Sequence, residues 1–206
     1  AAIGRVPNTD ADWFRSSGLK LDERGYVTVD GYGRTNLDGV WALGDITPGH
    51  ALAHRAFEQG ITIAEKIAGA DPKPVLDDTV PQVVFSFPEA ASVGLTLDQA
   101  KAREDVVEPK ETAYPMLSNA RMLMSGEGGS MTVVSGAFAN NPDMQVVLGV
   151  HIVSPIASDL IAEAEQLVGN RVPLADAARL IHPHPTFSET LGEALLKADG
   201  RPLHTR

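Results

Sequence analysis

The sequence predicts an α+β protein in two parts, with a largely antiparallel sheet in the second part. Helix-like and strand-like segments are mixed along the chain, and no strand–helix–strand unit repeats. Two apolar, β-branched runs, 131–138 and 145–152, flank the turn residues 140–143 and therefore predict a hairpin. A stretch with two prolines at 69–80 predicts the boundary between the parts, which we expect to cover 1–75 and 76–206.

Composition excludes several classes of function. The chain has 206 residues, is 43% hydrophobic and carries a formal charge of −10, which argues against nucleic acid or an anionic membrane as its main partner. No apolar run approaches the ~20 residues of a membrane span, and the start shows no secretory signal, so we expect a cytoplasmic protein. The chain contains no cysteine, which excludes disulfides, thiolate metal sites and dithiol chemistry by this chain alone.

In the first part we expect a short strand at 25–30, a turn at 31–36, a buried strand at 40–43 and a helix at 51–68. The turn resembles G-x-G-x-x-G, but Asn36 takes the place of the last glycine and no βαβ unit surrounds it. The chain therefore has no dinucleotide-phosphate fingerprint.

The helix at 51–68 has an apolar face at helical spacing, and we expect apolar area within 1–68 to be exposed in this chain. Gly60 costs such a helix roughly 1 kcal/mol relative to alanine, which predicts a close neighbour there. The residues on this face are Ala53, Ala56, Phe57, Gly60, Ile61, Ala64 and Ile67.

In the second part, Thr96 and Gln99 have the spacing of a capping box, which predicts a helix that ends near Arg103. Ser158 is expected to cap the helix 159–168, with Gly169 just past its end. We also expect strands at 82–86 and 106–114, a short helix at 173–180, and a helix at 188–198 that ends at Gly200 and packs Leu191, Ala194, Leu195 and Ala198 on the core.

Gly44-Asp45 follows the predicted strand 40–43 and precedes the predicted helix. A glycine allows close backbone approach, a carboxylate accepts hydrogen bonds from hydroxyls, and a helix N-terminus favours negative charge. The segment is therefore suited to a polyhydroxy or phosphate-bearing cofactor. The alternative is an ordinary strand end followed by a loop, because a two-residue motif is common.

The segment 182–189 (H-P-H-P-T-F-S-E) is the sharpest chemical feature. Prolines stiffen the backbone on both sides of His184, and we expect the His184–Pro185 bond to be cis. Glu189, at the start of a helix, can turn back to one imidazole nitrogen, fix the tautomer and leave the other nitrogen to act as base or acid. The alternative is a structural or surface histidine.

Two further histidines bear on this segment. A metal site of His182 with His184 lacks a third ligand nearby, so we expect no metal. We expect His182 to support the segment or to be partly exposed, and His204 to lie in a loose tail.

Residues 35–45 (T-N-L-D-G-V-W-A-L-G-D) resemble the second flavin-binding motif of the pyridine nucleotide–disulfide oxidoreductases. The resemblance continues in order to 182–189, and the segments 51–60 and 182–189 are most similar to the dihydrolipoamide-oxidising branch. It implies that 1–75 holds the end of an NAD domain and the C-terminal segment of an FAD-binding domain. Residues 76–206 would be the interface domain of a homodimer.

The resemblance also implies roles for individual residues. Asp45 would hold the FAD ribityl chain, and Gly44 would let the backbone approach the cofactor. Gly4 would lie near the nicotinamide cofactor, and His184 with Glu189 would be the base for a dithiol bound against the partner subunit. The flavin ring would be contacted by the start of the helix, Ala51, Leu52, Ala53 and His54. On residues alone, Gly4 is equally a strand end before a Pro-Asn turn.

The implied reaction oxidises dihydrolipoyl groups on the lipoyl domain of a 2-oxo acid dehydrogenase complex and reduces NAD. The chain lacks the FAD fingerprint, the redox cysteines and most of an NAD domain, and it begins without Met. We therefore expect a C-terminal fragment that is inactive alone and does not bind FAD or NAD by itself. The alternatives are a mycothione, glutathione or mercuric reductase, or a non-enzymatic dimerisation module.

Overall fold

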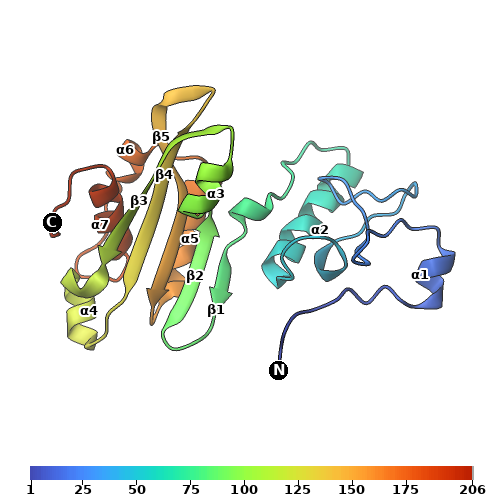
Figure 1. The fold of residues 1–206 in the computed structure, drawn as a ribbon, viewed down its shortest axis with the longest axis horizontal. Coiled ribbons are helices and arrows are strands. Elements are labelled where there is room, and N and C mark those ends of the chain that lie inside the picture. Colours follow the sequence, from blue (N-terminus) through green and yellow to red (C-terminus); the bar gives the residue numbers. More distant parts are fainter. Residues whose placement is uncertain (206) are drawn as a thin grey trace. The chain divides into compact units, whose positions relative to one another are not determined.

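The computed structural model describes residues 1–205 and divides into two compact units, one from Ala1 to Asp77 and the other from Asp78 onward. Figure 1 shows the elements of both. A single 3₁₀ turn, Asp77–Thr79, spans the division.

The first unit contains the helices α1 (Asp12–Ser16) and α2 (Ala53–Ile67) and the 3₁₀ turn η1 (Gly44–Ile46). The predicted strands at 25–30 and 40–43 are wrong, because residues 1–77 contain only two isolated bridges, Leu21 with Val27 and Arg34 with Trp41. A strand needs a row of paired neighbours, and each of these segments finds a partner for one residue only.

The predicted helix at 51–68 is confirmed at Ala53–Ile67, and much of its apolar face is exposed, as expected. Phe57, Ile61 and Ile67 are 71%, 52% and 61% exposed, whereas the buried side chains of α2 are Arg55, Thr62 and Ile63. The rest of the unit packs on the more polar side of the helix, so most of the apolar face has no cover within residues 1–77. A Cβ at Gly60 would meet only Leu43 Cδ2, at 3.9 Å, so no tight neighbour explains that glycine here.

One glycine of the first unit has a clear packing reason. Gly33 has φ +76°, and a Cβ there would lie 2.7 Å from Ile63 Cδ1 and 2.9 Å from the carbonyl oxygen of Ala42. Only glycine fits both the backbone and the space. The predicted turn at 31–36 is confirmed, and Gly33 packs it against α2.

The second unit is built on a five-stranded antiparallel sheet in the order β1-β2-β5-β4-β3. This confirms the predicted α+β class with an antiparallel sheet. Its strands are β1 (Gln82–Val84), β2 (Glu89–Gly94), β3 (Val106–Pro115), β4 (Ser130–Phe138) and β5 (Asn141–Ser154). The sequence did not predict β2, because its small residues Ala90, Ala91 and Ser92 have little strand propensity.

The predicted β4–β5 hairpin is confirmed, but its turn is shorter than expected. Phe138 pairs with Asn141, so only Ala139 and Asn140 form the turn. Pro142 and Asp143 belong to β5, where they extend the strand beyond the predicted start.

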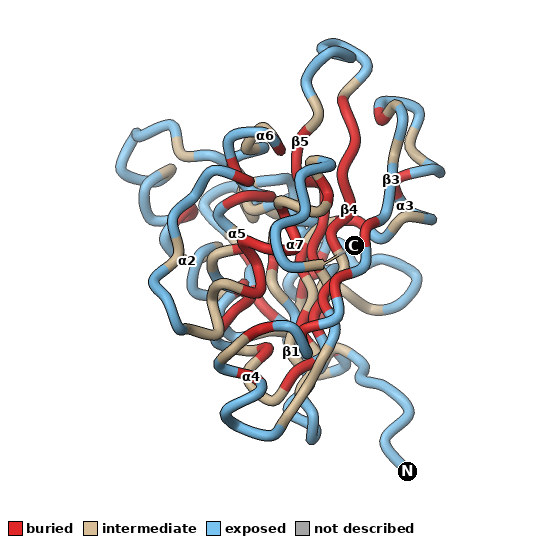
Figure 2. Tube along the Cα trace, turned by 90° about the vertical axis from the view of Figure 1, so that its left-hand side faces the viewer, coloured by how far each residue is buried: buried red, intermediate tan, exposed pale blue. Residues whose placement is uncertain are grey.

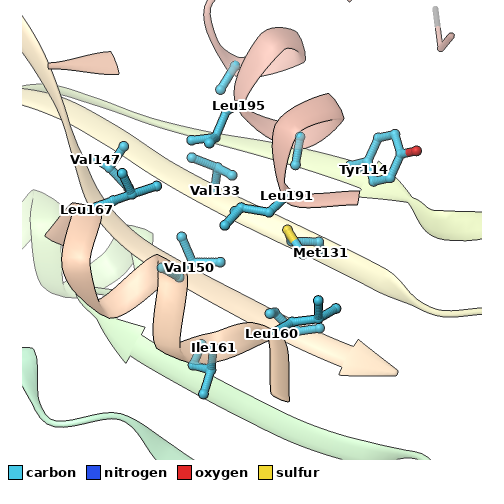
Figure 3. Close-up of a cluster of buried hydrophobic side chains, with 14 of the residues drawn as sticks. Tyr114, Met131, Val133, Val147, Val150, Leu160, Ile161, Leu167, Leu191 and Leu195 are labelled. Carbon is cyan, nitrogen blue, oxygen red and sulfur yellow. The ribbon is translucent and has the colours of Figure 1, made fainter. Parts of the chain in front are cut away.

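Helices cover both faces of the sheet. Val133 and Val147 belong to the larger core, under α5 (Ala157–Gly169), α6 (Leu174–Ala177) and α7 (Glu189–Ala198). Their neighbours Val134 and Val146 point to the opposite face and pack with α3 (Leu97–Ala102) in a smaller core. Figure 2 shows β4 and β5 buried along much of their length, and Figure 3 shows Leu160, Leu167, Leu191 and Leu195 directed at the strands.

Helix ends follow the predictions at α3 and α7 and depart from them at α5 and α6. The Thr96 capping box is present, with Gln99 N–H donating to Thr96 Oγ1 at 3.2 Å and Thr96 N–H donating to Gln99 Oε1 at 2.8 Å. Gly200, at φ +79°, ends α7 as predicted. The short helix α6 covers only Leu174–Ala177 of the expected 173–180.

At α5 both predicted caps are wrong. Ser158 lies inside the helix, and its N–H donates to Glu89 Oε2 at 2.8 Å. The carboxylate of Glu89, on the strand β2, therefore caps the helix in place of the Ser158 side chain. Gly169 also lies inside the helix. Arg171, at φ +50°, takes the left-handed position instead, and Val172 N–H donates to the Leu167 carbonyl at 2.9 Å.

Two short helices were not predicted, α1 and α4 (Ala120–Ser125). Among the described helices, none combines the length and the apolar character that a membrane crossing requires.

Candidate active-site pair and cofactor-binding turn

The imidazole of His184 and the carboxylate of Glu189 form a hydrogen-bonded pair. Nδ1 of His184 lies 2.8 Å from Oε1 of Glu189. The His184 side chain is 72% exposed, whereas that of Glu189 is 20% exposed. Because a carboxylate only accepts, Nδ1 donates and the other ring nitrogen, Nε2, is left as a basic nitrogen on an exposed ring.

The second oxygen of Glu189 accepts a hydrogen bond from the Thr186 N–H at 2.8 Å. Burial raises the pKa of Glu189, but the Thr186 N–H and the His184 imidazole lower it more, so the net pKa lies below its ordinary value. The carboxylate is therefore held ionised, and both of its oxygens are fixed to the segment that carries His184.

The His184–Pro185 bond is cis, as predicted. Glu189 is the first residue of α7, also as expected. Thr186 Oγ1 donates to the Pro183 carbonyl at 2.7 Å and lies 2.9 Å from Ser188 Oγ. The loop between α6 and α7 is thus closed on itself around the pair.

His182 supports the segment, with a largely covered side chain. Its side chain is 9% exposed, and Nε2 lies 2.8 Å from Oε1 of Glu163 on α5. The hydrogen bond to Glu163 raises the pKa of His182 above its ordinary value, although burial opposes this. His182 therefore fixes the base of the loop to α5, which is the supporting role expected as one of its two alternatives.

His204 does not lie in a loose tail. Its Nδ1 is 2.8 Å from Oε1 of Glu193, and its N–H donates to the other carboxylate oxygen at 3.2 Å. The Glu193 side chain is only 10% exposed, so the tail is tied to α7. Among the described residues, no group of three or more histidine, aspartate or glutamate side chains could hold a metal ion.

In the first unit, Gly44 and Asp45 form the 3₁₀ turn η1 rather than a strand end. Gly44 has φ +71°, its N–H donates to Gln59 Oε1 at 2.9 Å, and a Cβ there would lie 3.4 Å from the Cβ of Ala56. The turn therefore packs directly on α2. The Asp45 side chain is 58% exposed, with one oxygen 3.7 Å from Arg5 Nη1.

The loop between η1 and α2 is held by a residue that the sequence did not single out. Arg55 is 6% exposed; Nη2 donates to the Pro48 carbonyl at 2.6 Å and Nε to Asp77 Oδ1 at 2.6 Å. Nη1 lies 3.4 Å from Thr47 Oγ1. A Cβ at Gly49, which has φ +116°, would overlap this guanidinium. A buried arginine on a helix has no signature in a single sequence, so nothing in the pattern predicted it.

The predicted flavin-ring residues straddle the start of α2. Ala51 and Leu52 precede the helix, with Leu52 as its N-cap, and Ala53 and His54 open it. Gly4 has φ +143°, and a Cβ there would meet none of the described atoms within 4 Å, so this chain offers no close approach at Gly4. The structure thus brings together Gly44, Asp45 and the start of α2 in one unit, and His184 with Glu189 in the other.

Comparison with known families decides the assignment. Residues 80–195 match the model described as "Pyridine nucleotide-disulphide oxidoreductase, dimerisation domain", and residues 1–60 match the one described as "Pyridine nucleotide-disulphide oxidoreductase". The chain belongs to the pyridine nucleotide–disulfide oxidoreductases.

Among curated members of this family, the dihydrolipoyl dehydrogenase of Cupriavidus necator is 41% identical over 205 residues, which is 98% of this chain and 41% of that protein. That of Zymomonas mobilis is 37% identical, over 98% of this chain and 42% of that protein. The chain thus spans about two fifths of the length of the curated relatives it matches.

Two solved structures have a similar fold. LpdA from Mycobacterium tuberculosis has a TM-score of 0.84 at 31% identity, over 95% of this chain and 41% of that chain. The flavoprotein disulfide reductase RclA from Escherichia coli has a TM-score of 0.79 at 23% identity, over 94% of this chain and 43% of that chain, and supports the fold alone.

Proposed function

We propose that this chain supplies the dimerisation domain and the acid–base pair of a dihydrolipoyl dehydrogenase, which oxidises protein-bound dihydrolipoyl groups and reduces NAD. The observation that carries the proposal is the pair of His184 and Glu189, 2.8 Å apart, with the histidine ring exposed and the carboxylate largely covered. The identity to dihydrolipoyl dehydrogenases over 98% of the chain supports the choice of substrate.

In the proposed reaction, His184 takes a proton from the dithiol through Nε2. The ionised Glu189 would stabilise the resulting imidazolium through Nδ1 and keep the ring in one orientation. Because the Thr186 N–H holds the second oxygen of Glu189, the carboxylate does not have to reorganise when the charge forms. The chain contains no cysteine, so the thiol–disulfide exchange itself would need residues outside these 206.

The first unit fits a part of an FAD site. The exposed Asp45 carboxylate can accept hydrogen bonds from the ribityl hydroxyls, and Gly44 lets the backbone turn closely over α2. Residues 51–54 would present the N-terminus of α2 to the flavin ring, where negative charge is favoured. FAD, when bound, would pass the electrons of the dithiol on to NAD. Gly4 is proposed only to lie near the nicotinamide.

The proposed partners follow from the same assignment. The match of residues 80–195 to a dimerisation domain supports a homodimer, and dimerisation would be a condition of catalysis. The substrate-bearing partner would be the lipoyl domain of a 2-oxo acid dehydrogenase complex, and the expected cytoplasmic location is part of this proposal. By itself the chain is proposed to bind neither FAD nor NAD and to be inactive.

The test is the activity of the full-length protein that contains this chain, with dihydrolipoamide and NAD⁺ as substrates. We expect turnover, and we expect His184→Gln to lower kcat by about 10²-fold or more. His204→Gln serves as the matched control, because it removes a histidine of the same unit that is paired with a different glutamate. Equal kcat for the wild type and His184→Gln would overturn the role of His184.

The same assay separates the alternatives. Turnover of mycothione, glutathione disulfide or Hg(II), with none of dihydrolipoamide, would transfer the assignment to another reductase of the family. A full-length protein that is dimeric but inactive with all of these would indicate a dimerisation module.

A further inference from the structure

Asn119 links the catalytic loop to the neighbouring helix α4. Its side chain is 5% exposed, and Nδ2 donates to the Thr186 carbonyl oxygen at 3.1 Å, across 67 positions of sequence. Oδ1 accepts hydrogen bonds from the N–H groups of Arg121 and Met122, both at 3.0 Å, and so caps α4. All three polar contacts of this amide are with backbone groups.

The orientation of the amide is fixed by its partners. Backbone N–H groups only donate and a carbonyl only accepts, so Oδ1 must face Arg121 and Met122 while Nδ2 must face Thr186. The flipped amide would place donors against donors and an acceptor against an acceptor. The contact with Thr186 is therefore specific to an amide.

From Thr186 the connection runs directly to the acid–base pair. The C=O of Thr186 accepts from Asn119, the N–H of Thr186 donates to Glu189 Oε2 at 2.8 Å, and Glu189 Oε1 accepts from His184 at 2.8 Å. Thr186 thus links the two side chains: its C=O bonds to Asn119 and its N–H bonds to the carboxylate of Glu189. A shift of Thr186 would move the N–H that orients Glu189.

The helix α4, which Asn119 caps, is held by the larger core. Met122 of α4 is fully buried in the larger core, so the start of α4 cannot move without disturbing that core. The Arg121 guanidinium also lies 5.4 Å from the ring centre of Phe187, a second contact between α4 and the loop. The His184 side chain itself is exposed, so its position depends on the loop and on Glu189.

We propose that Asn119 is a positioning residue for the acid–base pair: through Thr186 it holds Glu189 so that His184 keeps one tautomer, with Nδ1 protonated. The catalytic consequence rests on the proposed function above, whereas the structural consequence does not. Nothing in the sequence pattern around Asn119 pointed to the loop, because the two segments are distant in sequence.

Aspartate is the discriminating substitution. Asn119→Asp keeps the acceptor that caps α4, and aspartate is as good a cap as asparagine, but its carboxylate cannot donate to Thr186. A residue that only caps a helix would tolerate this change. Asn141→Asp, at an exposed position of the hairpin, is the control for the added charge.

The measurement is the ¹⁵N spectrum of the His184 ring in this chain, in which protonated and unprotonated ring nitrogens have distinct shifts. The spectrum is recorded at a pH high enough to keep the ring neutral, where we expect Nδ1 protonated and Nε2 unprotonated in the wild type and in Asn141→Asp. In Asn119→Asp we expect the two tautomers to mix, with an unchanged circular dichroism spectrum. If aspartate unfolds α4, Asn119→Ser gives the same test, because serine also caps helices and its shorter side chain cannot span both contacts.

A wild-type tautomer in the folded Asp or Ser variant would overturn the proposal. In the active full-length enzyme, Asn119→Asp should lower kcat about tenfold, part of what a general base contributes, and leave the KM for NAD⁺ unchanged. Mixed tautomers with unaltered kcat would confirm that Asn119 positions the pair and would count against the proposed role of His184. The failure of the positioning role and the failure of the proposed function are therefore distinguishable.

Discussion

Glu189 reaches back five residues along the chain and places Oε1 2.8 Å from Nδ1 of His184. The pair joins the loop after α6 to the first residue of α7. A helix start favours negative charge. Burial raises the pKa of Glu189, but its hydrogen bonds to Thr186 and His184 lower that pKa more. The proposed base and the carboxylate that orients it thus lie in one short segment of the chain, 184–189.

Glu189→Gln removes the charge of this pair. Glutamine has one acceptor oxygen, so it cannot accept from both His184 Nδ1 and the Thr186 N–H, and it cannot stabilise an imidazolium as a carboxylate does. We expect kcat of the full-length enzyme with dihydrolipoamide to fall by about 10²-fold, in the range of a general base. Glu111→Gln, on an exposed position of β3, should leave kcat at the wild-type value, and an equal loss in both variants would contradict the prediction.

The pair of His182 and Glu163 predicts a pH dependence of stability. The bond to Glu163 raises the pKa of His182 in the folded protein above the 6.5 of a free histidine. The charged pair therefore contributes its full stability below about pH 6.5, and that contribution is lost as the pH rises through the raised pKa of the folded state. Wild type should lose more stability than Glu163→Gln between pH 6 and pH 9.

Urea unfolding followed by circular dichroism measures this difference. The strands all lie in the second unit, so the sheet signal reports on the unit that contains the pair. Parallel pH profiles for the wild type and Glu163→Gln would show that the pair is not ionised in the folded state.

The His184–Glu189 pair and the capping box of α3 were predictable because the partners are close in sequence. His184 and Glu189 are five residues apart, and the cap at Thr96 needs only Gln99. The contacts that hold the functional segments were not predictable, because their partners are distant: Glu163 with His182, Asn119 with Thr186, and Arg55 with Asp77.

Periodicity is local in sequence and predicted the helix α2 correctly, whereas the cap of α5 depends on a distant residue. At α5 the expected cap Ser158 is displaced by Glu89, which β2 brings to the helix start from 69 residues away.

Arg55→Lys should loosen the loop between Asp45 and α2. Lysine lacks the planar fork that contacts Thr47, Pro48 and Asp77 together. If the proposed FAD site is correct, the full-length variant should retain less FAD after gel filtration, measured as flavin absorbance per protein. Arg15→Lys, on an exposed position of α1, is the control, and equal FAD contents in the two variants would contradict a role for Arg55 in that loop.

Two glycine substitutions should change stability in opposite directions. A Cβ at Gly192 of α7 would lie 2.6 Å from Nδ1 and 2.9 Å from Cε1 of His182, whereas a Cβ at Gly60 of α2 would meet only Leu43 Cδ2 at 3.9 Å. Alanine favours a helix interior over glycine by roughly 0.5–1 kcal/mol, so Gly60→Ala should stabilise the first unit by about that amount.

At Gly192 the clash should outweigh this gain. The His182 ring is bonded to Glu163 at 2.8 Å and is nearly buried, so it cannot move aside without breaking that bond. Overpacking of this kind costs about 1–3 kcal/mol, and we expect Gly192→Ala to lower the free energy of unfolding of the second unit by that order. Urea unfolding of both variants decides the matter: a stabilised Gly192→Ala would mean that His182 can leave its place against α7, and the loop that carries His184 would then be less firmly held than its hydrogen bonds imply.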